Sequence, residues 1–230
     1  MTGDFPPCAI GNGKPVALTF DDGPNPGCTN RLLDLLATCR VTATFCVVGS
    51  SIRCPGGARV LRRISDEGHL IVNHSNDFAD LARLPAHEIA HRLLLTNSLI
   101  REALGADLDV TMFRAPNGSW GTGGRVAEVA ASLGMAPLGL GRVIYDWRDE
   151  WQDACRLTAN LRAALTPGAV VLAHDGGGDR TATVEAFERV LGNLDDGWTF
   201  VRPTPSRQPV SRSAHGSVAP VRGPARPQSR

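Results

Sequence analysis

Short apolar runs alternate with longer amphipathic segments through most of the chain. Each run ends at glycine, proline or polar residues, which is typical of buried strands. The runs predict strands at residues 15–20, 42–48, 69–73, 110–113, 135–140, 169–173 and 198–201. Between them, apolar residues recur at helical spacing, which predicts helices near residues 29–38, 57–67, 85–104, 122–133, 154–165 and 180–194. This alternation indicates an α/β fold with a parallel sheet and right-handed crossovers.

The order of these elements also predicts the domain organisation. Residues 1–14 form a short N-terminal lead-in, and residues 15–202 contain every predicted strand and helix. Residues 203–230 are rich in proline, serine and arginine and contain no acidic residue. Such a segment buries too little apolar surface to fold. We therefore predict one α/β domain followed by a disordered tail.

The first predicted strand ends in two adjacent carboxylates, Asp21 and Asp22, just before a turn at Gly23 and Pro24. Neighbouring residues of an extended chain point to opposite sides, so the two carboxylates are expected to have different roles. The carboxyl end of a strand is also where α/β proteins place their sites. Asp-Gly is a common turn dipeptide as well, so the pair alone does not distinguish a site from a solvated turn.

Three later strands end in residues that can carry chemistry. His74 follows the third predicted strand, Arg114 the fourth and His174 the sixth. The carboxyl ends of parallel strands lie at one edge of a sheet, so we expect these side chains to meet Asp21 and Asp22 there. Because the strands are not neighbours in the sequence, a closed or nearly closed barrel is favoured over an open sheet.

These fragments resemble the motifs of the polysaccharide deacetylase family (carbohydrate esterase family four), metal-dependent enzymes that remove acetyl groups from N-acetylated sugars. The family motif T-F-D-D-G-P is intact at Thr19–Pro24, R-x-P-x-G at Arg114–Gly118 and L-x-H at Leu172–His174. The motif D-x-x-D-W begins at Asp146, with its tryptophan displaced by one position to Trp151. The resemblance covers roughly residues 14–202 and implies an irregular (β/α)7 barrel.

Amide hydrolysis requires an activated water, a stabilised oxyanion and an acid for the departing amine. In this resemblance Asp21 is the expected general base, and Arg114 is expected to orient it and keep it ionised. His174 is the expected acid for the amine. Either Asp146 or Asp149 is expected to orient the His174 ring, since a hydrogen bond at one ring nitrogen selects the tautomer at the other.

The resemblance also implies a metal site and substrate contacts. Asp22 and His74 are the expected metal ligands, and Zn²⁺ is the expected ion, although another divalent metal would also suit these donors. A bound metal would lower the pKa of its water and polarise the carbonyl group. The backbone N–H of Asn117 is expected to hold the oxyanion, and Trp120 and Trp147 are expected to contact the substrate.

The second metal-binding histidine of the family motif H-[ST]-x-x-H is missing here. Phe78 stands four residues after His74 and cannot ligate a metal. Candidates for the third ligand are an oxygen of Asp77, Asn76 or Ser75, or a water. Since the other motifs are kept, we expect either a rebuilt loop or a Phe78 that packs against substrate, rather than a merely vacated ligand position.

Two further patterns match known motifs but are judged structural. His87, Glu88 and His91 match the H-E-x-x-H pattern of zinc peptidases, but Leu94 and Asn97 stand where metzincins have glycine and histidine. We expect these histidines on the polar side of a helix. The three glycines at 176–178 lack the rest of a phosphate-binding motif and are expected to form a flexible connection beside the site.

Composition restricts the classes of partner. The chain has 230 residues, 42% hydrophobic content and a net charge of +1, so it can bury a full core and is not expected to bind nucleic acid. It contains no apolar run long enough for a membrane span, and we expect a monomer. The first residues lack the features of a secretory signal, which favours a cytoplasmic location.

The six cysteines point the other way, because this number is unusual for a cytosolic domain. A secreted origin therefore stays open. Cys28 and Cys54 both follow strands predicted to be neighbours, so they are the pair that we expect to form a disulfide.

Three functions are compatible with these motifs. The altered metal loop and the absence of a secretory signal make the chain look like the enzymes that deacetylate the N-acetylglucosaminyl group of glycopeptide-antibiotic pseudoaglycones. Deacetylation of peptidoglycan or chitin oligosaccharides is the second interpretation. The third, motivated by Phe78, is an inactive barrel that binds sugar without hydrolysing it.

Overall fold

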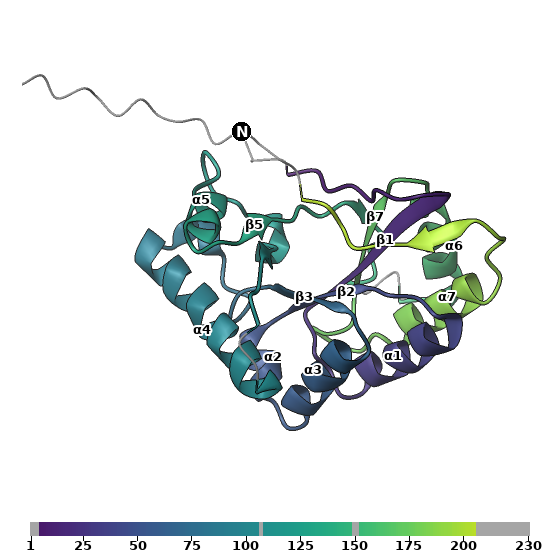
Figure 1. The fold of residues 1–230 in the computed structure, drawn as a ribbon, viewed down its shortest axis with the longest axis horizontal. Coiled ribbons are helices and arrows are strands. Elements are labelled where there is room, and N and C mark those ends of the chain that lie inside the picture. Colours follow the sequence, from purple (N-terminus) through teal and green to yellow (C-terminus); the bar gives the residue numbers. More distant parts are fainter. Residues whose placement is uncertain (1–4, 106–107, 149–151, 206–230) are drawn as a thin grey trace, which may run out of the picture.

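A computed structural model describes residues 5–105, 108–148 and 152–205 of the chain. Its centre is a curled parallel sheet in the order β5-β4-β3-β2-β1-β7-β6, with β8 paired to the start of β1 (Figure 1). The strands are β1 (Lys14–Asp21), β2 (Thr44–Val47), β3 (Leu70–Asn73), β4 (Met112–Phe113), β5 (Ala136–Pro137), β6 (Arg142–Val143), β7 (Val170–His174) and β8 (Trp198–Phe200). Within the described ranges no strand pairing joins β5 to β6, so the barrel is open between them.

Helices pack around the outside of this sheet (Figure 1). They are α1 (Cys28–Cys39), α2 (Gly49–Arg53), α3 (Gly57–Asp66), α4 (Ala86–Leu104), α5 (Arg125–Ser132), α6 (Ala154–Ala164) and α7 (Thr181–Leu191), with short 3₁₀ turns η1 (Leu81–Arg83) and η2 (Pro116–Gly118). In the part of the chain that the structure describes, no helix is long and apolar enough to cross a bilayer.

The fold confirms the predicted alternation of strands and helices, with two elements that sequence periodicity missed. Helix α2 spans five residues and strand β6 spans two, and segments this short carry too few positions to reveal a period. Helix α5 begins later than predicted, because Gly123 and Gly124 before it have φ values of +69° and +83°, which an α-helix does not contain. Of the tail predicted at residues 203–230, residues 203–205 are described, and Thr204 forms an antiparallel bridge with Cys8. The rest of this tail lies outside the described residues.

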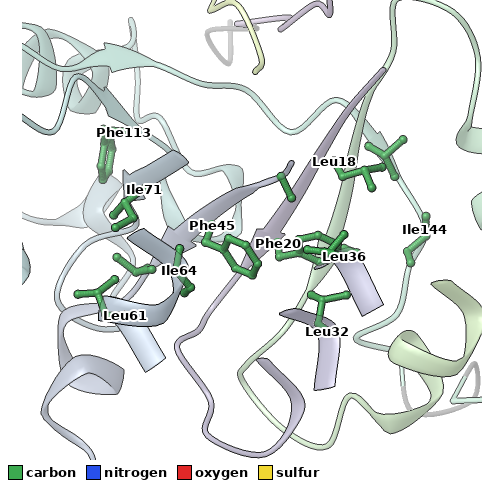
Figure 2. Packing of buried hydrophobic residues seen from close by; sticks show 14 of the residues in the cluster. Leu18, Phe20, Leu32, Leu36, Phe45, Leu61, Ile64, Ile71, Phe113 and Ile144 are labelled. Atoms are coloured by element: carbon green, nitrogen blue, oxygen red, sulfur yellow. The ribbon is translucent and has the colours of Figure 1, made fainter. Parts of the chain in front are cut away.

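The core lies between the sheet and the surrounding helices. Figure 2 shows Phe20 of β1 next to Phe45 of β2 and facing Leu32 and Leu36 of α1. The rings of Phe20 and Phe45 are 5.4 Å apart, and all four side chains are buried. Burying one such side chain contributes about 1.5–3 kcal/mol to the free energy of unfolding. This packing fixes β1 in the middle of the sheet.

The same packing directs the polar side chains of Thr19 and Asp21 on β1 toward the inside of the barrel. Side chains alternate along a strand, so Thr19 and Asp21 point away from the face that carries Phe20. Both accept hydrogen bonds from the buried guanidinium of Arg114, which follows β4. The alternation within one strand thus separates the hydrophobic core from the polar interior of the barrel.

Candidate active site

The strand ends predicted to carry chemistry converge on one cavity of about 590 Å³. This volume lies within the range of small-molecule sites, about 300–1,000 Å³. Its polar walls come from Asp21, Asp22, His74, Asn117, His174 and Arg180. Its apolar walls come from Phe78, Ala115, Pro116, Leu140, Val143, Trp147 and Leu172. The structure therefore assembles in one place most of the residues that the sequence singled out.

Asp21, which lines the cavity, forms a buried ion pair with Arg114. Arg114 Nη1 donates to Asp21 Oδ1 at 2.7 Å and to Thr19 Oγ1 at 2.8 Å, and its Nη2 donates to the Gly139 carbonyl at 3.0 Å. Burial raises the pKa of the Asp21 carboxyl, but the nearby cations, Arg114 first, outweigh burial and hold this pKa below 3.8. Asp21 is therefore a carboxylate at neutral pH, with Oδ1 held by Arg114 and Oδ2 lying 3.7 Å from His74 Nε2.

His174 and Asp146 form a second pair. His174 Nδ1 donates to Asp146 Oδ1 at 2.7 Å, and the backbone N–H of His174 donates to Asp146 Oδ2 at 2.8 Å. Burial lowers the pKa of His174, but the hydrogen bond and charge of Asp146 outweigh it and raise this pKa above 6.5. Because Nδ1 is occupied, Nε2 is the ring nitrogen that remains for substrate. Asp146 is thus the residue that orients His174, whereas Asp149 lies outside the described residues.

Asp22 and His74 form the pair expected to hold a metal. The carbonyl of Arg114 accepts a hydrogen bond from His74 Nδ1 at 2.8 Å, which leaves the lone pair on Nε2. That nitrogen lies 3.4 Å from Asp22 Oδ1. Two ligands about 2.1 Å from one tetrahedral zinc ion are themselves about 3.4 Å apart. Asp22 and His74 therefore have the spacing of two ligands on a single ion.

The position where the family motif has its second metal-binding histidine is occupied here by Phe78, which has no donor atom. Phe78 lines the cavity and is 51% exposed. Asp77, the first sequence-based candidate for this position, does not line the cavity, because its carboxylate pairs with Arg92 and accepts the N–H of Ala79. Across the described ranges, no group of three His, Cys, Asp or Glu side chains could hold a metal ion. The chain thus supplies a donor pair that fits a metal, but not the three protein ligands of a typical catalytic zinc site.

The other oxygen candidates of this loop, Ser75 and Asn76, do not line the cavity either. The Ser75 side chain is fully buried, and its hydroxyl has no hydrogen-bond partner in the described part of the protein. Asn76 Oδ1 accepts a hydrogen bond from Arg53. Neither residue belongs to the cavity lining. The predicted rebuilding of the loop around a new oxygen ligand is therefore not supported.

Left-handed backbone conformations mark the loops around the cavity. Asp22, Ser75 and Asn117 have φ values of +77°, +65° and +57°, which non-glycine residues rarely adopt. Such conformations are retained mainly where they position functional groups. At Asn117, within η2, this backbone lines the cavity next to Pro116, the place expected for an oxyanion-binding N–H.

The two tryptophans predicted to contact substrate differ in their environments. Trp147 lines the cavity and is 43% exposed, and its ring centroid lies 5.2 Å from that of His174 in an edge-to-face arrangement. Trp120 is only 4% exposed and packs against Phe5 and Phe113. The assignment of Trp120 to the substrate site was therefore wrong, because this ring belongs to the hydrophobic core.

The glycine segment after β7 is tightly packed, contrary to the predicted flexible connection. A Cβ atom on Gly176 would lie 2.3 Å from the Asp22 carbonyl oxygen, and one on Gly177 would lie 2.5 Å from Asp22 Oδ2. No side chain fits at either position. Sequence analysis also missed Arg180, a buried residue of the cavity wall. Only its short distance from His174 in the sequence could have suggested it.

Asp175 is a further buried carboxyl that the motifs did not single out. It accepts hydrogen bonds from Gly23 N at 3.1 Å and from the Thr29 hydroxyl. Burial is the main cause that raises its pKa to about 7. Asp175 thus supports the turn that follows Asp22 from behind the cavity.

The cysteines and the histidines of α4 bear on two further predictions. All six cysteines lie within the described ranges and are free thiols, so the predicted Cys28–Cys54 disulfide is wrong. Instead, Cys28 Sγ accepts the N–H of Arg180. His87, Glu88 and His91 are exposed on α4, as expected of a polar helix face.

Comparisons with known proteins agree with this geometry. The chain is 38% identical, over 74% of its length and 76% of the relative's, to a chitooligosaccharide deacetylase of Bradyrhizobium sp. (strain ANU 289). It superposes on the peptidoglycan deacetylase PdaC of Bacillus subtilis with a TM-score of 0.72 and 29% identity, covering 83% of this chain and 88% of PdaC.

A second structural relative is a CE4 family pseudoenzyme of Bacillus anthracis, with a TM-score of 0.68 and 26% identity, covering 79% of this chain and 60% of the other. The family model for polysaccharide deacetylase matches residues 10–138, more than half of the chain. With the two buried pairs and the donor pair at the ends of its parallel strands, the chain belongs to the polysaccharide deacetylase family.

Proposed function

We propose that this protein is a hydrolase that removes the acetyl group from N-acetylglucosaminyl units of chitin or peptidoglycan oligosaccharides. The observation that carries the proposal is that Asp21, paired with buried Arg114, and His174, paired with buried Asp146, line one cavity. The first pair lowers the pKa of a base and the second raises the pKa of an acid, which is the combination that amide hydrolysis requires. Relatives named for chitooligosaccharide and peptidoglycan deacetylation support the substrate class.

The proposed reaction consumes one water molecule. Asp21 takes a proton from the water, whose oxygen forms a bond to the acetamide carbon. The backbone N–H of Asn117 stabilises the negative charge that develops on the carbonyl oxygen. His174 gives its proton to the amine nitrogen as the carbon–nitrogen bond breaks, so that acetate and a free amino sugar are the products.

In this proposal Asp22 and His74 would hold a divalent metal, with Zn²⁺ as the preferred ion. When bound, such an ion would lower the pKa of a coordinated water and polarise the acetamide carbonyl. The rest of its coordination shell would come from water and substrate, because Phe78 offers no donor atom. Metal content per chain, measured by elemental analysis after dialysis against zinc, tests this part independently of turnover.

The substrate class is tested by acetate release. Chitin tetrasaccharide, a muropeptide digest and a glycopeptide-antibiotic pseudoaglycone are each incubated with the purified chain and zinc. We expect release from the first two, because the named relatives above act on such substrates. Release from the pseudoaglycone alone would instead support the small-glycoconjugate interpretation and contradict the choice of oligosaccharides.

A second candidate function is sugar binding without hydrolysis. It is favoured by one observation, the position of Phe78 where a third metal ligand is expected, and by the structural likeness to a CE4 family pseudoenzyme. Binding of chitin tetrasaccharide, measured by calorimetry, without acetate release at any zinc concentration would support this function over the first.

The His174–Asp146 pair predicts a specific pH dependence. The acid must be protonated, so turnover should fall as the pH rises through the pKa of His174, which lies above 6.5. Asp146→Asn removes the charge that raises this pKa, whereas the burial that lowers it remains. The alkaline limb of the kcat profile should therefore move to lower pH in the variant, while exposed Asp34→Asn leaves it unchanged. An unmoved limb in Asp146→Asn would contradict the assignment of the acid.

The substitution Phe78→His tests the altered metal loop. Since Phe78 lines the same cavity as Asp22 and His74, an imidazole there should join the donor pair. We now expect zinc to bind at least about tenfold more tightly, a gain of about 1.4 kcal/mol. This reverses the sequence-based expectation, because the oxygen donors of the loop, Ser75, Asn76 and Asp77, do not line the cavity. Competition with a chelator measures the change, Leu94→His on the exposed side of α4 is the control, and an unchanged affinity would restore the earlier interpretation.

A further inference from the structure

Arg180 occupies an unusual position in the wall of the cavity. It lies at the start of α7, is only 6% exposed and lines the cavity. Among the described residues it forms no ion pair with a carboxylate; its guanidinium instead donates to three backbone carbonyls. These are Gly176 at 2.8 Å, Asp146 at 2.8 Å and Gly177 at 3.1 Å. Burying a charged group costs free energy unless it is fully hydrogen-bonded, so this position calls for a specific explanation.

The three carbonyls belong to two segments that carry different parts of the site. Asp146 lies in the loop after β6 and its carboxylate holds the His174 ring at 2.7 Å. Gly176 and Gly177 lie in the loop after β7 and pack directly against Asp22. One guanidinium thus connects the acid pair on one side of the cavity with the donor pair on the other.

The directions of these bonds match what a guanidinium offers. Its donors point outward in a planar fork, so Nε, Nη1 and Nη2 can each reach a different carbonyl. A lysine has the same charge, but its single ammonium group is a point charge on a flexible stem. The simultaneous hydrogen bonds to three carbonyls on two loops therefore require the shape of the arginine side chain and not only its charge.

We propose that Arg180 is a positioning residue that sets the distance between the His174–Asp146 pair and Asp22 by tying together the loops after β6 and β7. It does so without contacting the reacting atoms. The inference rests on the proposed deacetylase activity only for its kinetic test. A displacement of one part of an active site by about 1 Å can lower turnover by about 10²-fold. Loss of the hydrogen bonds from Arg180 to the two loops should therefore reduce kcat strongly.

The test compares Arg180→Lys and Arg180→Met with Arg189→Lys. Arg189 is a half-exposed residue of the same helix whose partner Glu185 is 3.9 Å away, so its substitution controls for changes to α7. Steady-state acetate release from chitin tetrasaccharide gives kcat and KM. Proton NMR follows the low-field resonance of the His174 Nδ1 proton. This proton takes part in a charge-assisted hydrogen bond to Asp146. Thermal melting reports whether each variant is folded.

We expect kcat to fall by about 10²-fold in both Arg180 variants, with KM changed far less and the Nδ1–H resonance shifted or lost. Arg189→Lys should behave like the wild type. Normal kcat and an unmoved resonance in Arg180→Lys would overturn the proposal, since charge alone would then suffice. Unfolding of both Arg180 variants would also overturn it, because the residue would then be structural. If the wild type releases no acetate, the proposed function fails, whereas the resonance still decides the role of Arg180.

Discussion

Replacing Asp21 by asparagine is expected to abolish nearly all acetate release while substrate binding persists. The asparagine keeps the shape of the side chain but cannot accept the proton from water. Loss of a positioned general base typically lowers the rate by about 10²–10⁴-fold. Acetate release from chitin tetrasaccharide, with binding measured by calorimetry, checks this expectation.

The same substitution should also lower stability. Arg114 is fully buried and its only ion-pair partner among the described residues is Asp21, 2.7 Å away. Removing one member of a buried ion pair costs about 3–5 kcal/mol because the other charge stays buried. Chemical denaturation measures the loss, and Asp195→Asn, which affects an exposed pair with Lys14, should cost little. An Asp21→Asn variant with wild-type turnover would remove Asp21 from the mechanism.

Replacing either Asp22 or His74 by alanine is the second change with a large expected effect. With Phe78 in the third position, the chain offers two protein donors, and each variant retains only one. We expect both bound zinc and acetate release to be lost. Elemental analysis and the acetate assay measure the two effects on the same samples.

A matched control for these variants is His87→Ala. His87 is an exposed histidine of α4 outside the cavity, so its loss should change neither zinc content nor turnover. If Asp22→Ala and His74→Ala both retained zinc at the wild-type level, the metal would have to bind elsewhere and the donor pair would lose its proposed role. Loss of turnover with zinc retained would instead indicate a catalytic role for these residues without metal binding.

The residues of the site could largely be predicted because their signals are local. Asp21, His74, Arg114 and His174 each follow an apolar run, and parallel strands bring the ends of such runs to one edge. The missing ligand at Phe78 was visible for the same reason, since it depends only on spacing within one loop. The structure confirmed that Asp21, His74, His174 and Phe78 line one cavity, with Arg114 paired to Asp21.

Other parts of the prediction failed where contacts join distant segments. Asp77 was a plausible ligand until its carboxylate was found paired with Arg92, on a helix that follows the loop. Trp120 is an aromatic residue of a type that often contacts sugars, yet its ring packs against Phe5 from the N-terminal segment. A single sequence carries no signal for such pairings, because they depend on how complete elements pack together.

The sequence by itself determined the type and order of the longer elements and the polar residues at the ends of the strands. These depend on periodicity and turn chemistry, which act over a few neighbouring residues. Only the tertiary structure decided which of these groups are buried and paired. The structure shows that Asp146 hydrogen-bonds to His174 and that the barrel is open between β5 and β6. It also shows that Arg180 donates hydrogen bonds to the loops after β6 and β7. Burial and hydrogen-bond partners arise from packing between segments far apart in the chain, and they determine whether the pKa of each carboxyl and imidazole is raised or lowered.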